Sequence, residues 1–160
     1  MKNISRHPFQ IRGDSMFPSL VNLQQVSIVE ILQTYEISSG EIVVFSFDID
    51  PKKTADQKLW QVKRVIGLPG EQVIFRNSKV WIRNTLNQET ILEEEYLRNN
   101  SSYKLGLKNY PEKDKENADF VEPVLEPNQY YLLGDNRTGS HDSRNYGAIA
   151  RSLIRFRVIF

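Results

Sequence analysis

Residues 133–144 read Leu-Gly-Asp-Asn-Arg-Thr-Gly-Ser-His-Asp-Ser-Arg, directly after the apolar run Tyr130-Tyr131-Leu132-Leu133. The apolar run predicts a buried strand. Glycine permits sharp backbone turns, while aspartate, asparagine and serine side chains satisfy backbone donors. The segment therefore predicts a strand that ends in a tightly hydrogen-bonded loop.

The composition limits what kind of protein this is. A chain of 160 residues suits one domain with a real core. Its net charge of +1 argues against a nucleic-acid-binding protein, and the absence of cysteine excludes disulfides and thiolate metal sites. With two histidines, a zinc site is not expected, and we predict no cofactor and no metal. No apolar run reaches the roughly 18–20 residues of a membrane span, so we expect the chain as given to be soluble.

Hydrophobic patterning predicts a mostly β fold. Gln25–Glu30 alternates between polar and apolar residues, as a half-buried strand does, and Ile42–Phe45 is an apolar run typical of a strand buried on both faces. Further strands are expected at 60–66, 72–75, 79–83 and 155–158. We therefore expect antiparallel sheets with few helices.

The stretch 84–128 differs from the rest of the chain. It is polar and acidic, with charge runs at Glu93-Glu94-Glu95 and at 112–116 that predict solvated faces. We predict a catalytic β core formed by 1–83 and 129–160. We expect 84–128 to be an accessory excursion without a core of its own.

Two other segments carry candidate chemistry. Gly13-Asp14-Ser15-Met16-Phe17-Pro18 places a serine beside a glycine that allows close approach of a substrate backbone. A serine becomes a useful nucleophile only beside a base.

Lys63 lies between apolar residues in the predicted strand 60–66. At pH 7 only about one ordinary lysine in 2,500 is neutral, and burial lowers the pKa by disfavouring the ammonium. Taken alone, Lys63 can equally be an ordinary lysine whose ammonium extends from a strand edge to solvent, and Ser15 an ordinary turn serine; the chemistry of a general base depends on the motifs taken together.

Taken in order, three motifs resemble those of type I signal peptidases, the serine–lysine peptidases of family S26. These motifs are Gly13–Pro18, the K-R-x-x-G-x-P-G run from Lys63 to Gly70, and Gly134–Arg144. The resemblance implies the signal-peptidase β fold, shared with self-cleaving repressors, and a serine endopeptidase that removes signal peptides from secreted proteins. Ser15 would be the nucleophile and Lys63 its base.

The resemblance also implies roles for other residues. Ser140 would hydrogen-bond the amine of Lys63 and orient it. Arg64 would pair with Asp135, and Asp142 with Arg144, as structural support. Gly13 stands where some relatives have a serine that holds the oxyanion, so the backbone N–H of Ser15 is the remaining candidate donor.

The implied partners are signal peptides of preproteins and the membrane lipid surface, with no nucleic acid. The peptide would add as a strand between 9–13 and 60–63, with Ile11, Gly13 and Val62 binding it and small side chains preferred.

We expect Met16 and Phe17 to form an apolar rim that touches lipid. The implied location is the cell membrane, with the catalytic domain on the extracytoplasmic side. Since family members carry N-terminal anchors, we expect that the anchor has been removed rather than that this member lacks one.

Four alternatives remain open. His141 invites a serine–histidine–aspartate triad with its neighbours Ser140 and Asp142, but a triad is assembled in space from separate segments. A self-cleaving repressor would need a longer segment before Ser15 to carry its cleavage site. A conjugation-type or organelle inner-membrane peptidase of the same superfamily is the third. The last, from another class, is a catalytically silent β-rich binding module.

Overall fold

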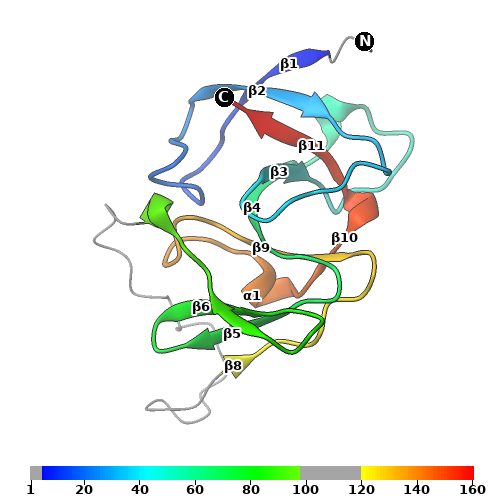
Figure 1. Cartoon of the computed structure of the whole chain (residues 1–160). Coiled ribbons are helices and arrows are strands. Elements are labelled where there is room, and N and C mark those ends of the chain that lie inside the picture. The colour runs from blue at the N-terminus through cyan, green and yellow to red at the C-terminus, as the bar shows by residue number, and fades with distance from the viewer. Residues whose placement is uncertain (1–4, 98–119) are drawn as a thin grey trace.

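The computed structural model describes residues 5–97 and 120–160, and its strands form two antiparallel sheets (Figure 1). The larger sheet has the order β1-β2-β11-β3-β4-β9-β10 and the smaller has the order β7-β6-β5-β8. The strands of the larger sheet are β1 (Arg6–Gln10), β2 (Gln25–Glu30), β3 (Ile42–Phe45), β4 (Gln61–Gly67), β9 (Gln129–Leu133), β10 (Ile149–Ala150) and β11 (Ile154–Ile159). The strands of the smaller sheet are β5 (Gln72–Arg76), β6 (Lys79–Arg83), β7 (Glu89–Ile91) and β8 (Phe120–Val121).

Helical turns are short in the described part of the chain. They are η1 (Ala55–Gln57), η2 (Glu95–Leu97), α1 (Ser143–Tyr146) and η4 (Arg151–Leu153). The predicted fold class, mostly β with antiparallel sheets and few helices, is confirmed.

The core follows from the alternation of side chains along β3, which has sheet neighbours on both sides. Val43 and Phe45 point into one apolar cluster, and Ile42 and Val44 point into another on the opposite face. The prediction of a strand buried on both faces is therefore confirmed. A third cluster joins β9 to the smaller sheet through Tyr131 and Leu133.

The stretch 84–128 is more integrated than the sequence predicted. Its described residues supply β7 and β8 to the smaller sheet, and Leu97 and Leu125 are buried. Glu94, expected on a solvated face, is also buried, because it forms an ion pair with Arg137. The second charge run, at 112–116, lies outside the described residues.

The pairing of β4 creates the space for a site. β4 pairs with β3 from Gln61 to Arg64, but it pairs with β9 only from Arg64 onward, where Leu133 is the last residue of β9. The chain therefore leaves the sheet at Gly134, beside Lys63. In the described part of the chain, the β9-side edge of Gln61–Lys63 has no strand partner.

Candidate active site

A groove of about 760 Å³ lies between β1 and the start of β4. Ser15 and Lys63 line it together with the apolar side chains of Ile11, Met16 and Val62. Its wall continues past β4 to Trp60 and Phe156, whose rings meet edge to face at 5.3 Å. The groove thus joins a hydroxyl and an amine to an extended, largely apolar trough.

Ser15 and Lys63 meet in this groove although they are 48 residues apart. The Lys63 Nζ donates to Ser15 Oγ at 3.0 Å and to the Val62 carbonyl at 3.1 Å. A deprotonated amine at the same position can accept the hydroxyl proton instead, which is the geometry a general base needs.

The environment of Lys63 favours the neutral amine. The residue is only 4% exposed, and burial lowers the pKa of Lys63 to about 8, against an opposing effect of the Asp142 carboxylate. About a tenth of the molecules then carry the free amine at pH 7. The desolvation predicted from the apolar neighbours of Lys63 is therefore present in the fold.

The loop that follows β9 packs directly against the nucleophile. The backbone N–H of Asn136 donates to the Ser15 carbonyl at 3.0 Å, and the Asn136 side chain donates to the Asp14 carbonyl at 3.1 Å. A Cβ on Gly134 would lie 2.1 Å from Ser140 Oγ and 2.4 Å from the Ser15 carbonyl oxygen. Only glycine fits at this position. Because both atoms lie so close to Gly134, Ser140 lies next to the loop that carries Ser15.

Asp142 organises this loop from a fully buried position. It caps α1, accepts hydrogen bonds from the Gly134 N–H at 2.9 Å and from the Arg144 Nε at 2.8 Å, and pairs with the Arg144 guanidinium. Burial opposes ionisation, but these donors hold the pKa of Asp142 below its usual value. The expected Asp142–Arg144 pair is present.

Arg64 points away from Lys63, as alternation along a strand requires. Its guanidinium forms a two-pronged ion pair with buried Asp135, with Nε–Oδ1 at 2.9 Å and Nη2–Oδ2 at 2.6 Å. It also donates to the Gly40 carbonyl at 2.9 Å. The expected Arg64–Asp135 pair is therefore present, and it ties the β9 loop to β4 one residue beyond Lys63.

Comparison with known proteins gives a consistent family. The family model described as signal peptidase, peptidase S26, matches residues 2–160. The chain belongs to this family. Signal peptidase IB of Staphylococcus aureus (strain N315) is 32% identical over 154 residues, covering 96% of this chain and 75% of that protein. Signal peptidase I S of Bacillus subtilis (strain 168) is 31% identical over 146 residues, covering 91% and 70%.

A solved structure supports the fold. The crystal structure of a signal peptidase I from Enterococcus faecalis V583 has a TM-score of 0.52 at 24% identity, covering 79% of this chain and 98% of that one. The type I signal peptidase predicted from the three motifs is thus confirmed, and with it a serine endopeptidase that removes signal peptides.

Ser140 of this signal peptidase differs in one respect from expectation. Its hydroxyl is buried and forms no hydrogen bond of full geometry among the described residues, although it lies close enough to the Asp142 carboxylate to help lower the pKa of Asp142; Lys63 instead bonds Ser15 and Val62. The predicted Ser140–Lys63 hydrogen bond is therefore absent. His141 next to it is exposed, and its ring lies 5.6 Å from that of Tyr146. These contacts give His141 no place beside Ser15.

The residues expected to bind substrate lie at the groove, with two corrections. Ile11 and Val62 line it, whereas Gly13, at φ +81°, lies just beyond β1, which ends at Gln10 rather than continuing to 13. Met16, expected on a lipid-facing rim, is 1% exposed because it packs in the apolar cluster with Ile11 and Val62. Phe17 is 46% exposed, as expected.

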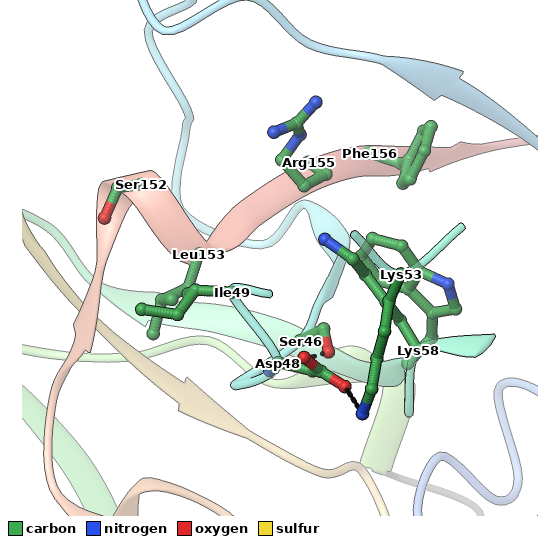
Figure 2. Close-up of a pocket in the computed structure, with 10 residues that line it drawn as sticks. Ser46, Asp48, Ile49, Lys53, Lys58, Ser152, Leu153, Arg155 and Phe156 are labelled. Atoms are coloured by element: carbon green, nitrogen blue, oxygen red, sulfur yellow. Dashed lines mark hydrogen bonds and ion pairs between the residues drawn. The ribbon is translucent and has the colours of Figure 1, made fainter. Parts of the chain in front are cut away.

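Figure 2 shows a second pocket, of about 330 Å³. It shares Lys58, Trp60 and Phe156 with the lining of the groove. Its charges are largely paired, since Lys53 binds Asp48 at 2.5 Å and Arg155 binds Glu30 at 3.1 Å. Its serines, Ser46 and Ser152, have no buried base beside them in the lining, so the pocket offers no counterpart to the Ser15–Lys63 pair.

Two features of membrane and metal-binding proteins are absent from residues 5–97 and 120–160. No helix there is long and apolar enough to cross a bilayer. Within the same ranges, no three histidine, aspartate or glutamate side chains gather as a metal site would require.

Sequence reasoning missed several residues that build the site. Asn22 accepts the Gly13 N–H at 2.8 Å, and nothing in the pattern around it signals that contact. Asn136 and Arg137 lie within the quoted loop but were assigned no role. Glu94 and Tyr96 were assigned to the excursion, and only the fold brings them to the loop.

Proposed function

We propose that Ser15 and Lys63 perform the signal-peptide cleavage as a nucleophile and its general base. The observation that carries this is the 3.0 Å contact between Lys63 Nζ and Ser15 Oγ, made by an amine that burial keeps partly neutral. Ser15 Oγ attacks the scissile carbonyl carbon while Lys63 takes the hydroxyl proton. Lys63 then gives that proton to the departing amine, and water hydrolyses the acyl-enzyme.

The negative charge of the tetrahedral intermediate needs a donor. With Gly13 in place of a hydroxyl-bearing residue, we assign this role to the backbone N–H of Ser15, which is not engaged in a hydrogen bond within the described residues. Gly13 leaves open space around its Cα, so a substrate backbone can approach. A fixed amide of this kind stabilises developing charge without reorganisation.

The substrate enters as an extra strand. The unpaired edge of Gln61–Lys63 offers main-chain partners, and Ile11 and Val62 lie beside it in the groove. From the family resemblance, we expect small side chains at the first and third positions before the cut. A peptide lying along this edge has its scissile carbonyl near Ser15.

Ser140 supports the base. A buried hydroxyl that forms no hydrogen bond of full geometry and only approaches a carboxylate, here that of Asp142, calls for an explanation. Here the hydroxyl lies beside the Ser15 carbonyl, within the loop that faces Lys63. We assign its missing partner to the Lys63 amine during the reaction, when the amine rotates away from the Val62 carbonyl to exchange protons.

The domain works at the membrane, on its extracytoplasmic side, where preproteins emerge. Apolar side chains of the loop between β1 and β2 are exposed next to the nucleophile, namely Phe17, Val21 and Leu23. Solvent exposure of several large apolar side chains on one loop is typical of a surface that contacts another apolar phase. The apolar rim therefore consists of these three side chains and does not include Met16, which is buried.

The dependence of cleavage on pH tests the base. Because Lys63 must be neutral, the rate with a peptide substrate should rise with pH through an apparent pKa near 8 and level off above it. Measuring kcat/KM between pH 6 and about 10 checks this. A profile that rises only near the ordinary lysine pKa of about 10.4 would exclude a desolvated Lys63.

The membrane contact has a separate test. Phe17→Ser/Leu23→Asn should lower co-sedimentation with anionic phospholipid vesicles at least about fivefold, because each side chain contributes about 1 kcal/mol or more when buried. Asparagine suits the positive φ of Leu23. Leu86→Ser removes an apolar side chain that is more exposed than either of these, on a turn between β6 and β7, and should leave co-sedimentation unchanged. An equal loss of co-sedimentation in both variants would contradict the proposal that this loop contacts the membrane.

A further inference from the structure

The segment 94–97 lies outside all three motifs, yet it packs against the loop that carries Ser140. It comprises Glu94 and the short η2 turn, and Leu97 anchors it in the core at 2% exposure. Glu94 is buried, although neighbouring Glu93 is exposed. A carboxylate is rarely buried without a partner, so the burial of Glu94 points to a specific contact.

The partner of Glu94 is Arg137, which lies in the loop that follows β9 and carries Ser140. The side chain of Arg137 is 3% exposed and forms a two-pronged ion pair with Glu94, with Nη1–Oε2 at 3.2 Å and a second contact from Nη2 to Oε1. Its remaining nitrogen, Nε, donates to the Gly134 carbonyl at 3.0 Å. Arg137 therefore joins the 94–97 segment to Gly134.

Gly134 connects these hydrogen bonds to Ser15 and Ser140. Its N–H is held by Asp142 and its carbonyl by Arg137, so the peptide groups on both sides of the residue are fixed. Its Cα lies so close to Ser140 and to the Ser15 carbonyl that no side chain fits. A shift of Gly134 would move both residues.

Tyr96 forms a second link from the same segment. Its hydroxyl donates to Glu94 at 2.8 Å, and the Arg64 guanidinium lies 3.8 Å from the centre of its ring. Burial raises the pKa of Tyr96 far above its ordinary value, so the hydroxyl remains a donor. Arg64 follows Lys63 in β4, and the segment thus contacts the supports of both reacting residues.

We propose that Glu94 and Tyr96 are positioning residues, which hold Arg137 so that its guanidinium fixes Gly134 and thereby places Ser140 and Ser15 against Lys63. This inference rests on the Ser15–Lys63 dyad proposed above. Glu94 does not touch the reacting atoms. Its effect passes through Arg137, and it should appear in kcat rather than in KM.

The decisive variant is Glu94→Leu/Arg137→Met, which removes both charges at once. Breaking a buried pair on one side leaves an unpaired charge, whereas replacing both partners by apolar groups is often neutral for stability. We expect a protein that stays folded, with a lower midpoint of urea unfolding because the Gly134 carbonyl and the Tyr96 hydroxyl each lose a partner. Its KM should stay within about twofold of the parent and its kcat should be at least about tenfold lower, because small misplacement of reacting groups is costly. Glu93→Gln, the matched exposed neighbour, should leave all three quantities unchanged.

A second variant covers the case in which the double variant does not fold. Arg137→Lys keeps a charge for Glu94, but one ammonium cannot reproduce the fork toward Glu94 together with the Nε bond to Gly134. It should stay folded and lose kcat, again at constant KM. Parent-level kcat in either folded variant would overturn the proposal. Ser15→Ala serves as the blank, and activity in this blank would instead overturn the dyad.

Discussion

Ser15→Ala and Lys63→Met should each lower kcat/KM for cleavage of a signal-peptide substrate by about four decades or more. In the proposed mechanism the two side chains act on one proton, so removing either leaves the other without a function. The double variant should therefore be no slower than the single variants, as is found for catalytic groups that act as a unit. The measurement is cleavage of one peptide, with alanine at the first and third positions before the cut, by all three variants and the parent.

We expect stability measurements to show that the loss of activity is chemical and does not come from unfolding. The folded pKa of Lys63, about 8, lies below its unfolded value near 10.5, so below pH 8 the fold holds a buried ammonium at a cost of about 3 kcal/mol. Lys63→Met should remove that cost, partly offset by two lost hydrogen bonds, and raise the free energy of unfolding by about 2 kcal/mol at pH 7. The gain should shrink between pH 8 and 10.5, where the lysine becomes neutral in the fold. Lys79→Met, on the exposed side of β6, should change neither activity nor stability.

Either of two results would contradict the dyad. One is substantial residual cleavage by Ser15→Ala or Lys63→Met. The other is a double variant much slower than both single variants, because additive losses mean that the two groups act in separate steps.

Local patterns predicted the strands well because each pattern reports the surroundings of its own residues. The alternation at Gln25–Glu30 and the apolar run at Ile42–Phe45 match β2 and β3. Their failures also have a physical cause. In the run Glu93-Glu94-Glu95 the three side chains are chemically identical, and only Arg137, 43 residues after Glu94, makes one of them buried. Met16 was misassigned because an apolar residue beside an exposed serine can point to either side of the loop.

In the site, too, local sequence patterns predicted some features, whereas others depend on residues far apart in the chain. The low pKa of Lys63 could be inferred from its apolar neighbours, since desolvation is a local effect. The contacts of Lys63 with Ser15 and of Arg64 with Asp135 join residues 48 and 71 positions apart, and no periodicity predicts such pairs. For these the resemblance of the motifs was needed. The surroundings of the Ser140 hydroxyl depend on how the loop after β9 folds against Ser15, and no local pattern in the sequence predicts that packing.

Ser140 and His141 are adjacent, and their alanine variants should behave in opposite ways. Ser140→Ala should reduce kcat by about a hundredfold, because the Lys63 amine loses the hydroxyl that aims it and a misplacement of about 1 Å has that effect. His141→Ala should remain within about tenfold of the parent, since His141 is exposed and its ring contacts Tyr146.

The stability of Ser140→Ala separates a functional hydroxyl from a structural one. Since the buried Ser140 hydroxyl forms no hydrogen bond of full geometry within the described residues and only approaches the Asp142 carboxylate, its removal should lower the free energy of unfolding by no more than about 1 kcal/mol. A structural hydroxyl would instead lower stability and activity together when removed. Kinetics on one peptide and urea unfolding of both variants decide between these readings. A folded but inactive His141→Ala would overturn the lysine mechanism, because an exposed loop histidine can have that effect only as the proton acceptor.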